Sequence, residues 1–108
     1  MLFVFIFLSI KTVSAQNYGL TFTNQNAYAQ VPVDPTLELT GPLTLEAWIY
    51  PTAWKTNVYQ GCILNKEGLN YQGYMLRCGA SGTLNFNIGS GTAWKELSSS
   101  SGALVLNT

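Results

Sequence analysis

The sequence predicts an all-β protein, an antiparallel β-sandwich of short strands. Apolar residues recur with a two-residue period, and clusters of Gly, Ser, Asn and Pro divide the runs about every ten residues. No apolar pattern of helical period lasts longer than one turn. The clearest run covers residues 43–51. Pro42 precedes it and Pro51 ends it, because proline donates no ladder hydrogen bond. One side of this central strand carries Leu43, Leu45, Ala47 and Ile49. On its other side we expect Trp48 to pack.

Further strands are expected before and after this run. They cover residues 18–23, 27–33, 61–66, 73–78, 83–88 and 94–97, with another apolar segment at 103–106. Residues 24–26 are expected to turn because Asn side chains bond to their own backbone and tolerate left-handed conformations. Residues 37–39 are expected to form one short turn against the core.

Composition limits the classes of function. The 108 residues include 5 basic and 5 acidic side chains and no histidine, and 9% of residues are charged against a typical ~25%. A neutral chain without clustered Lys or Arg argues against binding to nucleic acid or to anionic membranes. The absence of histidine excludes His-based catalytic triads and histidine metal sites.

The N-terminus is predicted to be a signal peptide. Residues 2–10 are a continuous apolar run, too short for the ~20 residues that span a bilayer. Val13 and Ala15 fit a signal-peptidase site with cleavage before Gln16. The alternative is a buried N-terminal strand. We therefore expect a signal peptide at 1–15, one domain at 16–108, and a secreted or cell-surface protein without a membrane span in the mature chain.

The two cysteines, Cys62 and Cys78, lie on neighbouring predicted strands. If residues 62–66 and 74–78 form a symmetric hairpin, paired positions sum to 140, which places Cys62 opposite Cys78. A disulfide there would stabilise the fold by ~3 kcal/mol in an oxidising compartment. The alternative is two buried free thiols.

The chain resembles the laminin-G-like, concanavalin A-like jelly-roll family. The resemblance rests on Tyr-Gly-Leu-Thr-Phe at 18–22, Ala-Tyr-Ala-Gln-Val-Pro at 27–32 and, above all, Leu-Glu-Ala-Trp-Ile-Tyr-Pro at 45–51, and it continues to residue 108. Secreted surface proteins and glycan-active enzymes often carry such domains as binding or spacer modules. Family members continue with a further strand after Leu-Asn-Thr, so we expect this chain to be the N-terminal part of the domain.

The resemblance also raises the question of structural calcium. Family members commonly have Asp-Gly after the first Phe and Asn-Asp before the Tyr, whereas this chain has Thr23-Asn24 and Asn26-Ala27. Calcium favours carboxylate ligands, and this chain lacks the two Asp carboxylates of these family motifs. We expect no cofactor; the alternative is a calcium site built on Asn26 and backbone carbonyls.

No catalytic residue is predicted. Glucanases of this fold carry Glu-x-Asp-x-x-Glu on one strand, and Glu46 has Thr44 and Trp48 at the two-residue positions instead. Glycoside hydrolysis needs two carboxylates ~5–10 Å apart. We therefore expect Glu46 to hydrogen-bond within the sheet. The alternative is the N-terminal half of a hydrolase whose carboxylates lie beyond Thr108.

Binding is the favoured function. Exposed aromatic rings stack on sugar rings while amides bond to hydroxyls, and such residues lie in or beside the predicted loops: Trp54, Asn57, Tyr59, Tyr71 and Trp94. Each aromatic could instead cover the core or an edge. The expected partner is a glycan or an extracellular protein, and the further alternative is a purely structural adhesin repeat.

Overall fold

The computed structural model describes residues 19–24, 26–57 and 60–108, and the chain divides into two units after Val31. The predicted signal peptide therefore lies outside the described residues. In the first unit the predicted turn at Asn24 is confirmed, because its Oδ1 accepts a hydrogen bond from the backbone N–H of Asn26 at 2.9 Å. In the part of the chain that the structure describes, no helix is long and apolar enough to cross a membrane.

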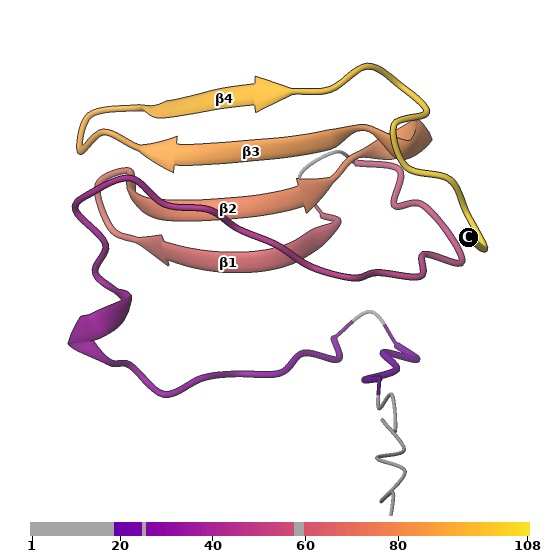
Figure 1. Ribbon diagram of the computed structural model, residues 1–108, viewed down its shortest axis with the longest axis horizontal. Coiled ribbons are helices and arrows are strands. Elements are labelled where there is room, and N and C mark those ends of the chain that lie inside the picture. The colour runs from indigo at the N-terminus through magenta and orange to yellow at the C-terminus, as the bar shows by residue number, and fades with distance from the viewer. Residues whose placement is uncertain (1–18, 25, 58–59) are drawn as a thin grey trace, which may run out of the picture. The chain divides into compact units, whose positions relative to one another are not determined.

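The second unit is built on one antiparallel sheet of four strands in the order β1-β2-β3-β4 (Figure 1). The strands are β1 (Cys62–Gly68), β2 (Gln72–Cys78), β3 (Leu84–Gly89) and β4 (Trp94–Ser98). Two 3-10 turns accompany them, η1 (Pro35–Leu37) and η2 (Ala80–Gly82). The four strands predicted between residues 61 and 97 are thus confirmed, and the protein is all-β.

The two faces of the sheet differ in chemistry. The strand registers place Leu64, Leu76, Phe86 and Leu97 in one row and Lys66, Tyr74, Ile88 and Lys95 in the next. We call this side the apolar face. The alternate positions make the polar face: Asn65, Glu67, Met75, Arg77, Asn85, Asn87, Trp94, Glu96 and Ser98.

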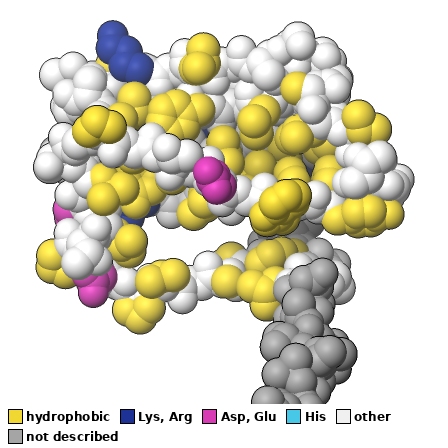
Figure 2. Space-filling view, viewed as in Figure 1, with side chains coloured by type: hydrophobic (Ala, Val, Ile, Leu, Met, Phe, Trp, Pro, Cys, Tyr) yellow, Lys and Arg dark blue, Asp and Glu magenta, His cyan; other side chains and the backbone are white. Residues whose placement is uncertain are grey.

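Within the second unit, residues 37–43 lie against the apolar face (Figure 1) and line a hollow there with Lys66, Tyr74 and Ile88. Asp34 caps η1 by accepting a hydrogen bond from the N–H of Thr36 at 2.8 Å, so the predicted short turn lies two residues earlier than expected. The Lys66 Nζ–Glu38 Oε1 ion pair at 2.7 Å ties the turn to β1. The Tyr74 hydroxyl also donates to the Leu37 carbonyl at 3.3 Å. Figure 2 shows hydrophobic side chains gathered over this side of the molecule.

Three predicted strands are absent from the described residues. The segments at 19–23, 27–33 and 43–50 have no ladder partner there, although the alternating pattern is visible in the last of them. Leu43, Leu45 and Ile49 are half-buried, whereas the residues between them are exposed. Trp48 is fully exposed at 104%, so its predicted packing role is wrong. Alternation selects the side that faces the sheet, but a strand also needs a neighbour for its backbone.

The disulfide prediction is not supported. Cys62 and Cys78 are free thiols in the structure. The predicted pairs Leu64–Leu76 and Lys66–Tyr74 are confirmed, but an irregularity between Cys62 and Leu64 pairs Cys62 with Arg77. One extra residue in a strand moves the next side chain to the opposite face.

The backbone at Gly61 lies close to Cys78. A Cβ on Gly61 would lie 2.0 Å from the Cys78 carbonyl oxygen and 2.8 Å from the Cys78 sulfur, so this close approach requires glycine. The thiol donates to the Gly61 carbonyl at 3.3 Å. Burial raises the pKa of both thiols above the ordinary value of 9.0, with a smaller opposing effect of Arg77 on Cys62.

Candidate functional site

An aromatic pair stands at one end of the sheet. The Tyr71 ring, in the β1–β2 turn, meets the Trp94 ring, at the start of β4, edge to face with centroids 6.5 Å apart and planes at 77°. Tyr71 is 51% exposed, and Trp94 is half-buried. Edge-to-face packing fixes the orientation of both rings while leaving apolar surface open to solvent.

The turn that carries Tyr71 is unusual in its backbone. Asn70 and Tyr71 both have positive φ, 58° and 55°, a conformation that is uncommon for a bulky side chain. The Tyr71 carbonyl accepts a hydrogen bond from the N–H of Gly91 at 3.0 Å. A Cβ on Gly89 would lie 2.1 Å from the Tyr71 carbonyl oxygen, so this close approach requires glycine. The β3–β4 connection thereby holds Tyr71 in place.

A hydrogen-bond network crosses the polar face from β2 to β4. The Arg77 guanidinium donates to Asn87 Oδ1 at 2.6 Å and to Glu96 Oε2 at 3.3 Å. The Asn87 amide donates to the same Glu96 oxygen at 2.9 Å, and the Ser98 hydroxyl donates to the other carboxylate oxygen at 2.9 Å. The Asn85 amide donates to Ser98 Oγ at 2.7 Å. The Glu96 carboxylate is therefore held from three sides.

The inner members of this network are buried. Asn87 is 1% exposed and Asn85 2%, whereas the Glu96 side chain keeps 39% of its surface in solvent. The hydrogen bonds from Asn87 and Ser98, with the nearby Arg77 charge, hold the pKa of Glu96 below its ordinary value of 4.5. Glu96 is thus ionised at neutral pH and presents an oriented carboxylate to solvent.

Trp94 of the aromatic pair and three members of the network line one open hollow of about 440 Å³ on the polar face. Its lining residues are Cys62, Asn65, Glu67, Met75, Arg77, Asn87, Trp94 and Glu96. Asn65, Glu67 and Glu96 are exposed at its surface, and Met75 lies below them. We call this feature the polar hollow.

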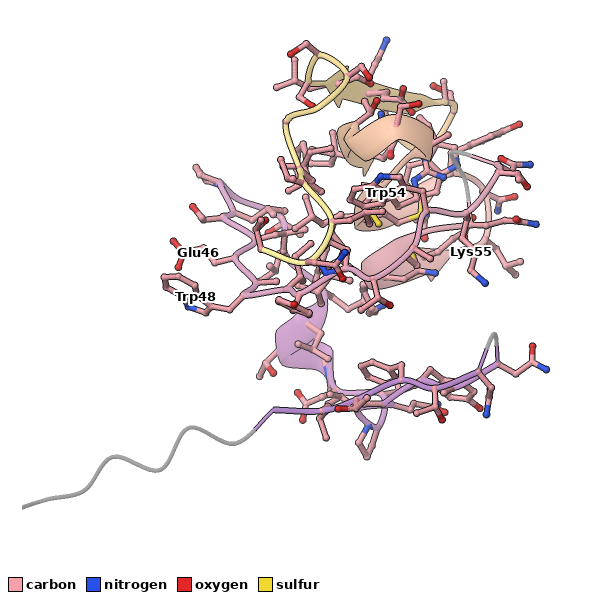
Figure 3. The ribbon with its side chains drawn as sticks, turned by 90° about the vertical axis from the view of Figure 1, so that its right-hand side faces the viewer. Glu46, Trp48, Trp54 and Lys55 are labelled. Carbon is pink, nitrogen blue, oxygen red and sulfur yellow. The ribbon has the colours of Figure 1, made fainter. Side chains whose placement is uncertain are left out.

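The structure brings together only part of the predicted ligand set. Tyr71 and Trp94 contact each other, and Trp94 lines the polar hollow. Trp54 lies at the other end of the sheet, where its ring approaches Gly82 (Figure 3). Trp54 is half-buried there. Asn57 is exposed, and its carbonyl accepts from the N–H of Gln60 at 3.1 Å. Tyr59 lies outside the described residues.

Sequence reasoning missed the polar network. None of Arg77, Asn85 and Asn87 is among the predicted site residues. The sequence carries one signal of this network, namely polar side chains at alternate positions of neighbouring strands. It becomes a cluster only once the registers Met75–Asn87 and Asn87–Glu96 are known.

Among the described residues no group of three or more His, Cys, Asp or Glu side chains could hold a metal ion. Asn26, the residue named for a calcium site, lies in a turn whose Asn24 side chain already accepts a backbone hydrogen bond. The residues that line the polar hollow offer hydrogen-bonding groups and the aromatic surface of Trp94.

Comparison with known proteins gives one finding. The family model Laminin_G_3, described as the concanavalin A-like lectin/glucanases superfamily, matches residues 22–108. No curated protein and no solved structure was found to match the chain. The family match covers most of the sequence and agrees with the all-β structure. The chain belongs to the concanavalin A-like lectin/glucanases superfamily, as a laminin-G-type β-sandwich module.

Proposed function

We propose that this protein is an exported recognition module that binds neutral glycans in the polar hollow and catalyses no reaction. The observation that carries the proposal is that Trp94, whose ring packs edge to face on Tyr71, and an oriented, ionised Glu96 line one open hollow. A sugar ring has an apolar face that packs on an aromatic ring and a rim of hydroxyls that bond to carboxylates and amides. Sites for small ligands typically combine an aromatic surface with a small number of oriented polar groups.

The arrangement of the hollow assigns different roles to its residues. Trp94 supplies the apolar surface, and Asn65, Glu67 and Glu96 are exposed where they can bond to hydroxyls. Arg77 and Asn87 are buried beneath them and orient Glu96 through the bonds described above. A preformed site loses less freedom on binding than one that must be ordered by its ligand.

The charge of the hollow favours neutral sugars over acidic ones. It contains two carboxylates, Glu67 and Glu96, and one guanidinium, Arg77. The guanidinium already bonds to Glu96 at 3.3 Å, so a uronate or sulfate would meet an excess of negative charge.

Binding is favoured over hydrolysis by the placement of the two carboxylates. Glu67 is on β1 and Glu96 on β4, so three strand spacings separate them in the sheet. At ~4.8 Å per spacing their backbones are ~14 Å apart, which exceeds the ~5–10 Å of hydrolase carboxylate pairs. The lowered pKa of Glu96 also opposes a role as general acid, which needs a raised pKa.

Export rests on the apolar run at residues 2–10 and the small residue Ala15. N-terminal sequencing of the protein recovered outside the cell should begin at Gln16. Recovery with residues 1–15 intact would contradict cleavage at this position.

A glycan array followed by titration calorimetry tests the binding function. We expect the chain to bind neutral oligosaccharides and to ignore polyuronates, and Trp94→Ala to lower the affinity about tenfold or more, equivalent to ~1.4 kcal/mol or more. Trp48→Ala is the matched control, because Trp48 is exposed and is not among the residues of the hollow. Loss of binding in Trp54→Ala but not in Trp94→Ala would move the site to the other end of the sheet. Release of reducing sugar would contradict the non-catalytic function.

A further inference from the structure

The β1–β2 turn lies beside a position of β3 that carries no side chain. The register pairs Gly89 with Trp94, so the residue directly opposite the indole on the neighbouring strand is a glycine. A Cβ on Gly89 would collide with the Tyr71 carbonyl oxygen, so the Tyr71 backbone occupies the space that a side chain at residue 89 would fill. The Gly91 N–H also bonds to this carbonyl at 3.0 Å. The turn is therefore anchored next to Trp94 through its backbone.

The Tyr71 ring supports the indole where the neighbouring strand does not. A strand residue is normally oriented in part by the side chain directly opposite it, and glycine supplies none. The Tyr71 and Trp94 rings meet edge to face, and within the described part of the chain Tyr71 is the one aromatic partner of Trp94. The Tyr71 hydroxyl makes no hydrogen bond to a described residue. The contact therefore depends on the ring of Tyr71 and not on its hydroxyl.

Tyr71 and Trp94 stand in different relations to the polar hollow. Trp94 is one of the residues that line it, whereas Tyr71 is not. Tyr71 is thus placed to act on a ligand through the Trp94 ring.

The backbone of Tyr71 is unfavourable for its residue type. Asn70 and Tyr71 have φ values of 58° and 55°. Asparagine tolerates this left-handed region, but a bulky side chain is strained there. Asparagine at residue 71 would therefore suit the turn better than tyrosine does. A residue that opposes its local backbone preference points to a functional role at that position.

We propose that Tyr71 is a positioning residue of the glycan site, which holds the Trp94 ring as the apolar wall of the polar hollow. This inference rests on the proposed function, because the Trp94 ring is the surface on which a sugar would pack. A ring that is already oriented loses less freedom when the ligand binds, so the support of Tyr71 increases the affinity.

Quenching and circular dichroism of Trp94 test the positioning without any ligand. In the full chain with Trp48→Phe and Trp54→Phe, Trp94 is the remaining tryptophan. We expect Tyr71→Asn to increase the quenching of Trp94 by acrylamide and to weaken its near-UV band, because the indole loses its partner. Tyr71→Phe should retain both signals, since it keeps the ring. Leu69→Asn, in the same turn and 86% exposed, is the matched control and should change neither signal.

Titration calorimetry with neutral gluco-, galacto- and manno-oligosaccharides measures the consequence for binding. Tyr71→Asn should lower the affinity roughly threefold to tenfold, the fold-change that corresponds to the loss of one aromatic pair. Tyr71→Phe should restore the wild-type affinity. In a Trp94→Ala background, Tyr71→Asn should cause no further loss, because a positioning residue acts through the ring that is missing. A further loss of the same size there would mean that Tyr71 contacts the sugar itself, and would overturn the proposal.

The two measurements separate this inference from the proposed function. If Tyr71→Asn loosens Trp94 but the wild-type chain binds none of the oligosaccharides, the proposed function fails and the positioning of Trp94 stands. If quenching and dichroism of Trp94 are the same in Tyr71→Asn as in wild type, the inference is overturned whatever the chain binds. Equal changes in Leu69→Asn would also overturn it, because they would show a general effect of altering the turn.

Discussion

Replacing Asn87 by alanine should destabilise the protein more than the same change at Asn85. The two residues share a strand, a face and a side-chain type, and are 1% and 2% exposed. Asn87 bonds to two charged groups, Arg77 at 2.6 Å and Glu96 at 2.9 Å, whereas Asn85 bonds to the neutral Ser98 hydroxyl at 2.7 Å. The contrast isolates the effect of charged partners at matched burial.

The expected loss of stability depends on the groups that lose a hydrogen-bond partner in each variant. A hydrogen bond to a charged group contributes ~1.5–3 kcal/mol, and a neutral one ~0.5–1.5 kcal/mol. Glu96 recovers part of its loss from water because its side chain is 39% exposed, whereas the Arg77 side chain is 11% exposed. We therefore expect Asn87→Ala to lower the free energy of unfolding by roughly 2–4 kcal/mol and Asn85→Ala by about 1 kcal/mol or less.

Urea unfolding followed by tryptophan fluorescence measures both values. The two variants should share the slope of the wild-type transition, since neither change alters the surface exposed on unfolding by much. Asn85→Ala also removes an Oδ1 that is buried without a hydrogen-bond partner among the described residues, which reduces its cost further. An Asn85→Ala loss equal to or greater than that of Asn87→Ala would refute the assignment of the network as the stabilising feature of this face.

Two further predictions concern titratable groups. The pKa of Glu96 is lowered from 4.5 in the folded protein, so its contribution to stability is present above pH 4.5 and is lost as the pH falls through the folded pKa. Thermal melts between pH 7 and pH 3 should show a smaller acid loss for Glu96→Gln than for wild type, and identical profiles would contradict this. Secondly, mass spectrometry after alkylation should find both cysteines free, with Cys62 modified faster than the half-buried Cys78, and faster still as the pH rises towards 9.0. An intact disulfide in the isolated protein would contradict the bulged register.

The sequence alone determined the local β-structure. Period-two alternation and the turn residues between the runs located all four strands of the sheet, because each hairpin is specified by residues close together in the chain. The same reasoning predicted the pairs Leu64–Leu76 and Lys66–Tyr74. It also placed Tyr71 and Trp94 in or beside loops, and the family resemblance agreed with the fold class that alternation predicts.

Tertiary structure decided what the local pattern leaves open. The extra residue before Leu64 turns Cys62 away from Cys78, and no residue type in this stretch marks it in advance. Alternation gives two sides of a strand but not the neighbour that covers each side, so Trp48 was expected to pack and is exposed instead. The polar network joins Arg77, Asn87 and Glu96 from three strands. Contacts between residues distant in sequence depend on register and sheet order, which only the folded chain establishes.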